Sequence, residues 1–169
     1  MDVFSRPADE FVNDPALEGL WAIKAVDHMK IHFNLIRSID PTILKLTPKD
    51  DLIYKQFREQ FPNLEVATLA EDAIKSPQAK EEWRAFCNQF ENQVEDFNYA
   101  TLLRLNSQDD YNESNTIVVP RIQFLAIEVA RNREGFNSSI REKFKNVADE
   151  KEQVKNNSQE PDSVASWFN

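Results

Sequence analysis

The sequence predicts an α+β fold that is mostly helical, a compact single domain of about four to five helices with a small antiparallel hairpin or sheet. Three observations support this. Long segments carry apolar residues at helical spacing, two β-prone segments flank one polar loop, and 169 residues suffice for one domain. We expect the globular domain at 14–144, an N-terminal arm at 1–13, and a disordered charged tail at 145–169.

A long first helix is predicted from Pro15 to Ile39. Asp14-Pro15 supplies an acceptor side chain before a proline whose missing N–H does no harm at the first turn, and Asp40-Pro41 ends the helix. Ile23, Val26 and Phe33 fall outside the main apolar face, which indicates a helix covered on more than one side. The residues of that main face are Leu17, Leu20, Trp21, Ala25, His28, Ile31, His32, Leu35 and Ile39.

Two further helices open at a proline. Thr47-Pro48 starts a helix that Pro62 stops, and Ser76-Pro77 starts another that runs to about Asp96. Residues 64–69, which lie between these helices, are expected to be a strand or an extended loop.

The second half of the domain is predicted to contain an irregular hairpin followed by an apolar helix. Its strands are 99–105 and 116–119, on either side of a polar loop. Pro120 begins the helix, and Gly135 suits the position after its end, where a left-handed residue is needed. A short amphipathic piece through Phe144 follows.

Composition excludes several classes of protein. The only glycines are Gly19 and Gly135, too few for a dinucleotide fingerprint, a phosphate-binding P-loop or the loop of a Rossmann-type methyltransferase. No cofactor is therefore expected. The single cysteine, Cys87, excludes an internal disulfide and a multi-cysteine metal site.

The net charge of −9 limits the classes of molecule that the protein is expected to bind. A pI near 4.8 disfavours direct binding of nucleic acid or anionic membranes, so basic proteins or nascent segments fit better, unless the charge serves solubility alone. The N-terminus lacks a basic leader with an apolar core, and no apolar stretch reaches 18 residues. A cytoplasmic or nuclear location is expected.

The candidate chemical groups each have a structural interpretation that we favour. His28 and His32 share a helix face at metal-ligand spacing, but no third histidine exists, so we expect core histidines with satisfied nitrogens and no metal site. Cys87 lies between Trp83 and Phe90, as a packing residue would. The adjacent acids, such as Asp50-Asp51, are better explained as helix caps and solvated faces, and no catalytic residue is predicted.

One polar stripe stands out on the apolar helix after Pro120. Arg121, Glu128 and Asn132 share it, with Arg131 beside them. Two interpretations remain open: a client-contacting patch, or an internal network, which we favour because unpaired burial of charge is costly. Glu95, Asp96 and the hairpin backbone are available partners.

Long motifs resemble the polysaccharide biosynthesis domain-containing protein family of eukaryotes, over residues 14–137. They are Ala79-Lys-Glu-Glu-Trp-Arg-Ala-Phe-Cys87, Val94-Glu-Asp-Phe-Asn-Tyr-Ala-Thr-Leu-Leu-Arg104, Asn115-Thr-Ile-Val-Val-Pro-Arg-Ile-Gln-Phe124 and Ala126-Ile-Glu-Val-Ala-Arg-Asn-Arg-Glu-Gly135. Val118-Val119 departs from the aromatic-small pair expected before Pro120, and the tail, which ends in Trp167-Phe168, is shorter than in vertebrate members.

This resemblance implies a non-enzymatic chaperone. Members look like dedicated folding factors that meet nascent translation elongation factor 1-alpha at the ribosome and shield its GTP-binding domain until it folds. Recruitment through the nascent polypeptide-associated complex would suit an acidic protein that ribosomal RNA repels. The alternative, which the family label suggests, is a transferase of polysaccharide biosynthesis that acts on a glycan or transfers a methyl group.

Overall fold

The longest helix, α1 (Pro15–Ser38), begins at the predicted proline and ends just before Asp40-Pro41. The computed structural model describes residues 15–144, with side chains from Gly19 onward. The predicted arm (1–13) and tail (145–169), with its Trp167-Phe168 pair, lie outside the described residues.

The buried face of α1 differs in part from the prediction. Ala25 and His32 are buried as predicted, and Ile36, which was not placed on the core face above, is buried as well. Leu20, Ile31 and Ile39, which were placed on that face, are 51%, 62% and 39% exposed. The core face is narrower than predicted because α1 packs on β1 and α5 along one side. Coverage on a second side is limited to the C-terminal half, where Phe144 packs edge-on against Phe33 with ring centroids 5.2 Å apart.

The second helix, α2 (Asp50–Gln60), starts two residues after Pro48. Its first residue fixes the approach of the chain, because the Asp50 carboxylate accepts hydrogen bonds from the amides of Leu46 and Thr47, both at 2.8 Å. The Thr47 hydroxyl in turn accepts from the Lys49 amide at 3.0 Å. These local bonds satisfy backbone groups at the helix start.

The next two helices are α3 (Asp72–Lys75), which the sequence patterns did not predict, and α4 (Pro77–Asn88). The start of α4 is as predicted, since the Ser76 hydroxyl accepts from the Ala79 amide at 3.1 Å. The predicted end at Asp96 is wrong. Residues 89–97 form turns, and Asp96 adopts a positive φ of 54° that reverses the chain toward β1.

The hairpin is confirmed. β1 (Ala100–Arg104) pairs antiparallel with β2 (Thr116–Pro120), and the 3-10 helix η3 (Glu113–Asn115) precedes β2. Residues 64–69 include an extended piece, because the Leu69 amide donates to the Leu105 carbonyl and the Ser107 amide to the Ala67 carbonyl, both at 2.9 Å.

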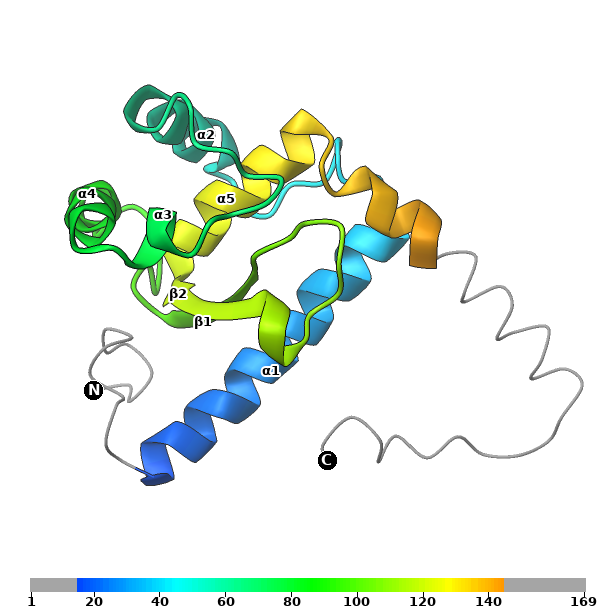
Figure 1. The fold of residues 1–169 in the computed structure, drawn as a ribbon, viewed down its shortest axis with the longest axis horizontal. Coiled ribbons are helices and arrows are strands. Elements are labelled where there is room, and N and C mark those ends of the chain that lie inside the picture. Colours follow the sequence, from blue (N-terminus) through cyan, green and yellow to red (C-terminus); the bar gives the residue numbers. More distant parts are fainter. Residues whose placement is uncertain (1–14, 145–169) are drawn as a thin grey trace, which may run out of the picture.

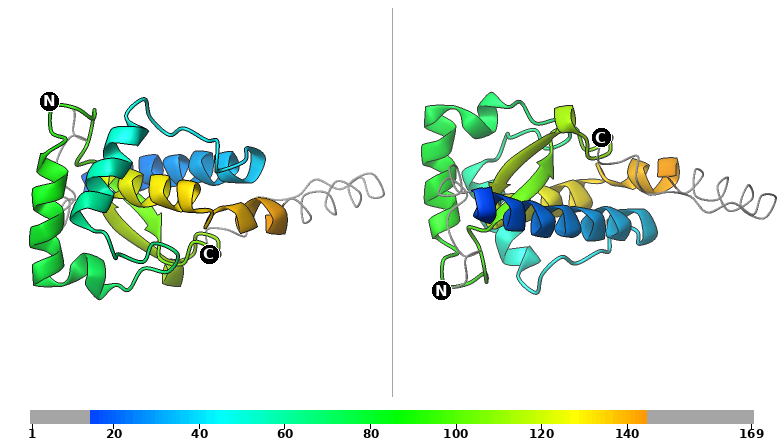
Figure 2. Two further views of the ribbon diagram at one scale, coloured as in Figure 1. Left: turned by 90° about the horizontal axis from the view of Figure 1, so that it is seen from above. Right: turned by 90° about the horizontal axis from the view of Figure 1, so that it is seen from below.

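The last labelled helix, α5 (Arg121–Glu134), lies in the middle of the fold, where it contacts α2, α4 and both strands (Figure 1). Gly135 ends it with φ of 85°, as predicted, and residues 138–144 are again helical. Figure 2 shows α4 lying across the direction of α1 and α5 at one end of the molecule, with residues 138–144 at the other. The predicted class, a mostly helical domain with a two-stranded antiparallel sheet, is confirmed.

Candidate functional site

The polar stripe of α5 lies inside the core. Glu128 and Arg131 have no exposed surface and Asn132 retains 2%. Arg131 follows Glu128 by one helical turn, so its Nη1 donates to Glu128 Oε1 at 2.8 Å. We call Glu128, Arg131, Asn132 and the residues that bond to them, Arg104 and Asn137, the buried cluster.

Arg131 is held from three directions besides Glu128. Its Nε donates to the Val66 carbonyl at 2.7 Å, and its Nη2 donates to the carbonyls of Arg104 and Leu105 at 2.8 and 2.9 Å. Of the partners that the sequence analysis named, the hairpin backbone is the one that bonds to Arg131. Glu95, another candidate, is exposed. These bonds tie α5 to β1 and to the extended segment before α3.

Arg104 is a second buried cation that the sequence analysis missed. One guanidinium nitrogen, Nη2, lies 3.5 Å from each Glu128 oxygen and donates to Asn137 Oδ1 at 2.8 Å, while Nη1 donates to the Ser107 carbonyl at 2.8 Å. One signal was present, because an arginine within the run Leu102-Leu103-Arg104-Leu105 is a charge in an apolar strand.

Asn137 completes the cluster from the turn after α5. Its Nδ2 donates to Glu128 Oε2 at 2.9 Å and to Asn132 Oδ1 at 2.7 Å. Gly135 makes this possible, because its left-handed backbone turns the chain back over the last turn of α5. No sequence pattern marked Asn137 in advance.

The electrostatics of the buried cluster favour one charged state. Burial alone would raise the pKa of Glu128, but the guanidinium groups of Arg104 and Arg131 outweigh burial and hold its pKa well below the usual range. Two cations therefore share one anion. The carbonyls of Val66, Arg104, Leu105 and Ser107 accept further guanidinium N–H groups, whereas the Nε of Arg104 is buried without a hydrogen-bond partner among residues 15–144.

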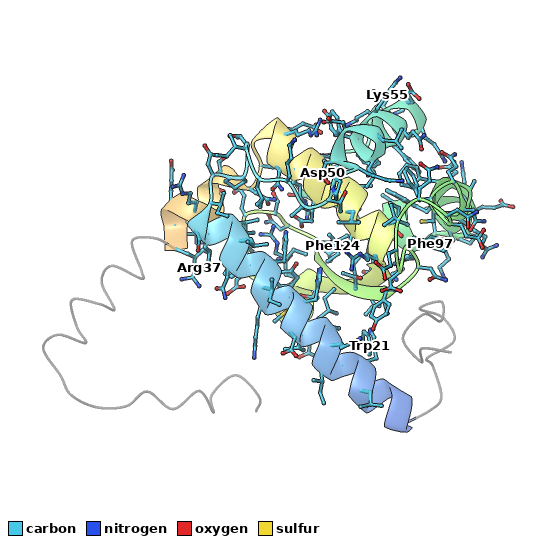
Figure 3. All side chains as sticks on the ribbon, turned by 180° about the vertical axis from the view of Figure 1, so that it is seen from behind. Trp21, Arg37, Asp50, Lys55, Phe97 and Phe124 are labelled. Carbon is cyan, nitrogen blue, oxygen red and sulfur yellow. The ribbon has the colours of Figure 1, made fainter. Side chains whose placement is uncertain are left out.

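His32 borders the buried cluster from α1 as a neutral side chain. Its Nδ1 lies 3.2 Å from the Tyr111 hydroxyl and its Nε2 3.6 Å from Glu128 Oε2. Burial lowers the pKa of His32 to about 4, and although Glu128 opposes this, the two arginines reinforce it. The imidazole also packs nearly perpendicular to the ring of Phe124, which lies between α1 and α5, with centroids 4.9 Å apart (Figure 3).

The remaining predicted residues lie apart from the cluster. Arg121 is half-buried in the first turn of α5, and among the described residues it has no hydrogen bond to the cluster. Its charge, after burial, helps to lower the pKa of His28. The Nδ1 of His28 and the Nε2 of His32 are both buried without a hydrogen-bond partner in residues 15–144, so the expectation of satisfied nitrogens fails at both histidines.

Cys87 is buried in the core between α4 and its neighbours. Burial raises the pKa of its thiol to about 12, so the thiolate needed for nucleophilic attack is not available near neutral pH. Within residues 15–144 no group of three or more histidine, cysteine, aspartate or glutamate side chains is placed to hold a metal ion. No helix in this range is long and apolar enough to cross a membrane.

The fold and the buried cluster together define a small α+β domain in which buried charged residues connect α5 to the hairpin and to the segment before α3. A family model described as PBDC1 protein matches residues 17–142. The chain belongs to this family.

Proteins from several eukaryotes are similar to this chain. Protein PBDC1 of Mus musculus is 53% identical over 136 residues, which are 80% of this chain and 69% of the mouse protein. The human protein is 52% identical over 136 residues, 80% of this chain and 58% of its own length. A solution NMR structure of a Saccharomyces cerevisiae protein superposes with a TM-score of 0.70 at 37% identity, covering 77% of this chain and 92% of that one.

Proposed function

We propose that this protein is a non-enzymatic chaperone that binds nascent translation elongation factor 1-alpha and shields its GTP-binding domain until it folds. The observation that carries the proposal is membership of the PBDC1 family over residues 17–142, since the resemblance to that family implies this role. The net charge of −9 supports a basic client, because complementary charge speeds encounter.

The chemistry of the core supports a binding role over catalysis. The Glu128 carboxylate is bonded to two arginines and an asparagine, the Cys87 thiol is protonated near neutral pH, and His32 is fully enclosed. Each of these groups is engaged in packing or in a hydrogen bond inside the domain.

Ribosome-bound complexes captured with the tagged protein test the proposal. We expect the captured nascent chains to be enriched in elongation factor 1-alpha, and depletion of the nascent polypeptide-associated complex to reduce that enrichment. Recovery no greater than with an unrelated acidic domain of the same size would contradict the proposal.

A ligand-binding screen distinguishes the transferase alternative from the chaperone proposal. A sugar nucleotide or a methyl donor that binds the folded protein would raise its melting temperature, and the rise would grow with the logarithm of ligand concentration above the dissociation constant. We expect no such rise with UDP-sugars or S-adenosylmethionine.

A further inference from the structure

A shallow hollow lies between the end of α2 and the helices α3 and α4. Its volume is about 250 Å³, and Phe61, Leu64, Ala73 and Ala79 supply its apolar lining. Pockets that hold a small-molecule ligand usually have roughly 300 to 1,000 Å³, so this hollow suits a side chain better than a cofactor.

The floor of the hollow is built from well-fixed groups. The Phe61 ring stacks on Trp83 with centroids 4.3 Å apart and planes 20° apart, and the Trp83 indole donates to the Ala73 carbonyl at 3.2 Å. Arg58 holds the adjoining turn, because its Nη1 donates to the carbonyls of Phe61 and Leu64 at 3.1 and 2.8 Å. The aromatic surface is therefore preorganised.

Two carboxylates line the same hollow. Asp72 from α3 and Glu82 from α4 are both exposed, and Gln78 orients Glu82 by donating to its Oε1 at 3.1 Å. No cation is among the residues that line it. An aromatic floor with two acidic side chains matches a guanidinium, which can stack on a ring and bond to a carboxylate in the plane of its N–H groups.

The surrounding segment has the same sign of charge. Residues 61–99, which join α2 to β1, contain eight acidic and three basic side chains, a net charge of −5 out of −9 for the whole chain. This field attracts basic segments toward the end of the molecule that carries α3 and α4 (Figure 2).

We infer that the hollow between α2, α3 and α4 docks a basic segment of a partner protein, with an arginine over Phe61 between Asp72 and Glu82 and a neighbouring apolar side chain on Leu64. This inference deepens the proposed function, since it names the chemistry of the client segment. It is distinct from the buried cluster, whose side chains are all buried in the core.

Synthetic peptides test the docking directly. A fluorescent peptide with the repeat Leu-Arg is titrated into the full chain, beside a peptide in which citrulline replaces each arginine. Citrulline keeps the shape and removes the charge. We expect the arginine peptide to bind at low salt, its affinity to fall with added salt, and the citrulline peptide to bind about tenfold more weakly or not at all.

Charge-neutral variants locate the site. The double variant Asp72→Asn/Glu82→Gln should weaken the arginine peptide about tenfold, because each change removes one carboxylate. The control Asp27→Asn/Glu113→Gln makes the same change in net charge at exposed positions of α1 and η3, and it should leave affinity within about twofold. Equal losses in the two variants, or no loss in either, would overturn the inference.

The same variants distinguish this inference from the chaperone proposal. If the peptides fail to bind at the hollow but the nascent client is still captured, the docking site is wrong and the chaperone proposal stands. If the peptides bind as expected and the nascent client is not captured, the hollow stands and the client assignment is wrong.

Discussion

Glu128 is a fully buried carboxylate. Its charged form is stabilised by two arginines from different elements, Arg104 in β1 and Arg131 in α5. Replacing Glu128 by alanine would leave Arg104 and Arg131 buried beside each other without an anion. We predict that Glu128→Ala lowers the free energy of unfolding by about 3–5 kcal/mol. Denaturant melts followed by circular dichroism measure this loss.

A matched glutamate provides the comparison for that experiment. Glu113 is exposed in η3, so Glu113→Ala should change the unfolding free energy by no more than about 0.5 kcal/mol. A Glu128→Ala protein as stable as the Glu113→Ala protein would show that the buried cluster does not stabilise the fold.

His32 predicts a pH dependence of stability. The pKa of its imidazole is about 4 in the folded protein and about 6.5 when unfolded, so the unfolded chain binds the extra proton first. The contribution of His32 is present above pH 6.5 and is lost as pH falls toward 4. By pH 5 we expect a loss of about 2 kcal/mol.

The variant His32→Gln isolates this effect, since glutamine does not titrate. We expect it to reduce the slope of unfolding free energy against pH between 6.5 and 4, whatever its stability at pH 7. The lowered pKa of His28 leaves a remaining slope of the same sign. Identical slopes in the two proteins would exclude His32 as the titrating group.

Cys87 is a third buried group whose polarity can be altered. A hydroxyl at this position would have to be desolvated, so Cys87→Ser should lower the free energy of unfolding by roughly 1–3 kcal/mol. Because the polarity of the new group causes this loss, Cys87→Ser should be less stable than Cys87→Ala. Thermal melts of the two variants give the order. Client capture per folded molecule should not change; its loss at unchanged stability would make the thiol functional.

Among the elements, α4 offers the clearest local test. Its start depends on one side-chain bond, from the Ala79 amide to the Ser76 hydroxyl. We predict that Ser76→Ala lowers the unfolding free energy by about 1 kcal/mol, the usual effect of losing an N-cap. Ser139→Ala, at an exposed helical position, is the control, and a loss no larger than its own would contradict the prediction.

Elements were predictable where the signal is local. Pro15, Ser76-Pro77 and Gly135 mark boundaries by their own backbone chemistry, and the structure places helix ends at each. The end of α4 was missed because the turn at 89–97 is set by tertiary contacts: the Ile122 amide donates to the Phe97 carbonyl at 2.8 Å. The exposure of Ile31 likewise depends on which side of α1 its neighbours occupy.

The buried cluster, like the elements, was predictable only where its contacts are local in the sequence. Glu128 and Arg131 are one turn apart, a spacing that allows the two side chains to pair, and the structure shows that they do. Arg104 and Asn137 reach them only through the hairpin and the turn after α5, and no spacing rule connects segments so distant. Arg121 was grouped with them by face, but seven residues of helix separate it from Glu128 by about 10 Å.

At the scale of the whole molecule, the core should be independent of the end of the chain. Residues 151–169 offer few apolar side chains to offset the entropy of ordering. We predict that removing them changes the melting temperature by only a few degrees, as calorimetry would measure. A large drop would mean that Trp167 and Phe168 stabilise the domain.

The buried cluster also has a consequence for synthesis on the ribosome, where the N-terminus emerges first. Four other segments of the chain contribute groups to its contacts: His32 from α1, the Val66 carbonyl, Arg104 from β1, and Asn137 from the turn after α5. The carboxylate of Glu128 and its two arginines therefore cannot all be satisfied until residue 137 has left the exit tunnel. The domain consequently completes its core only when nearly all of its described residues are available together.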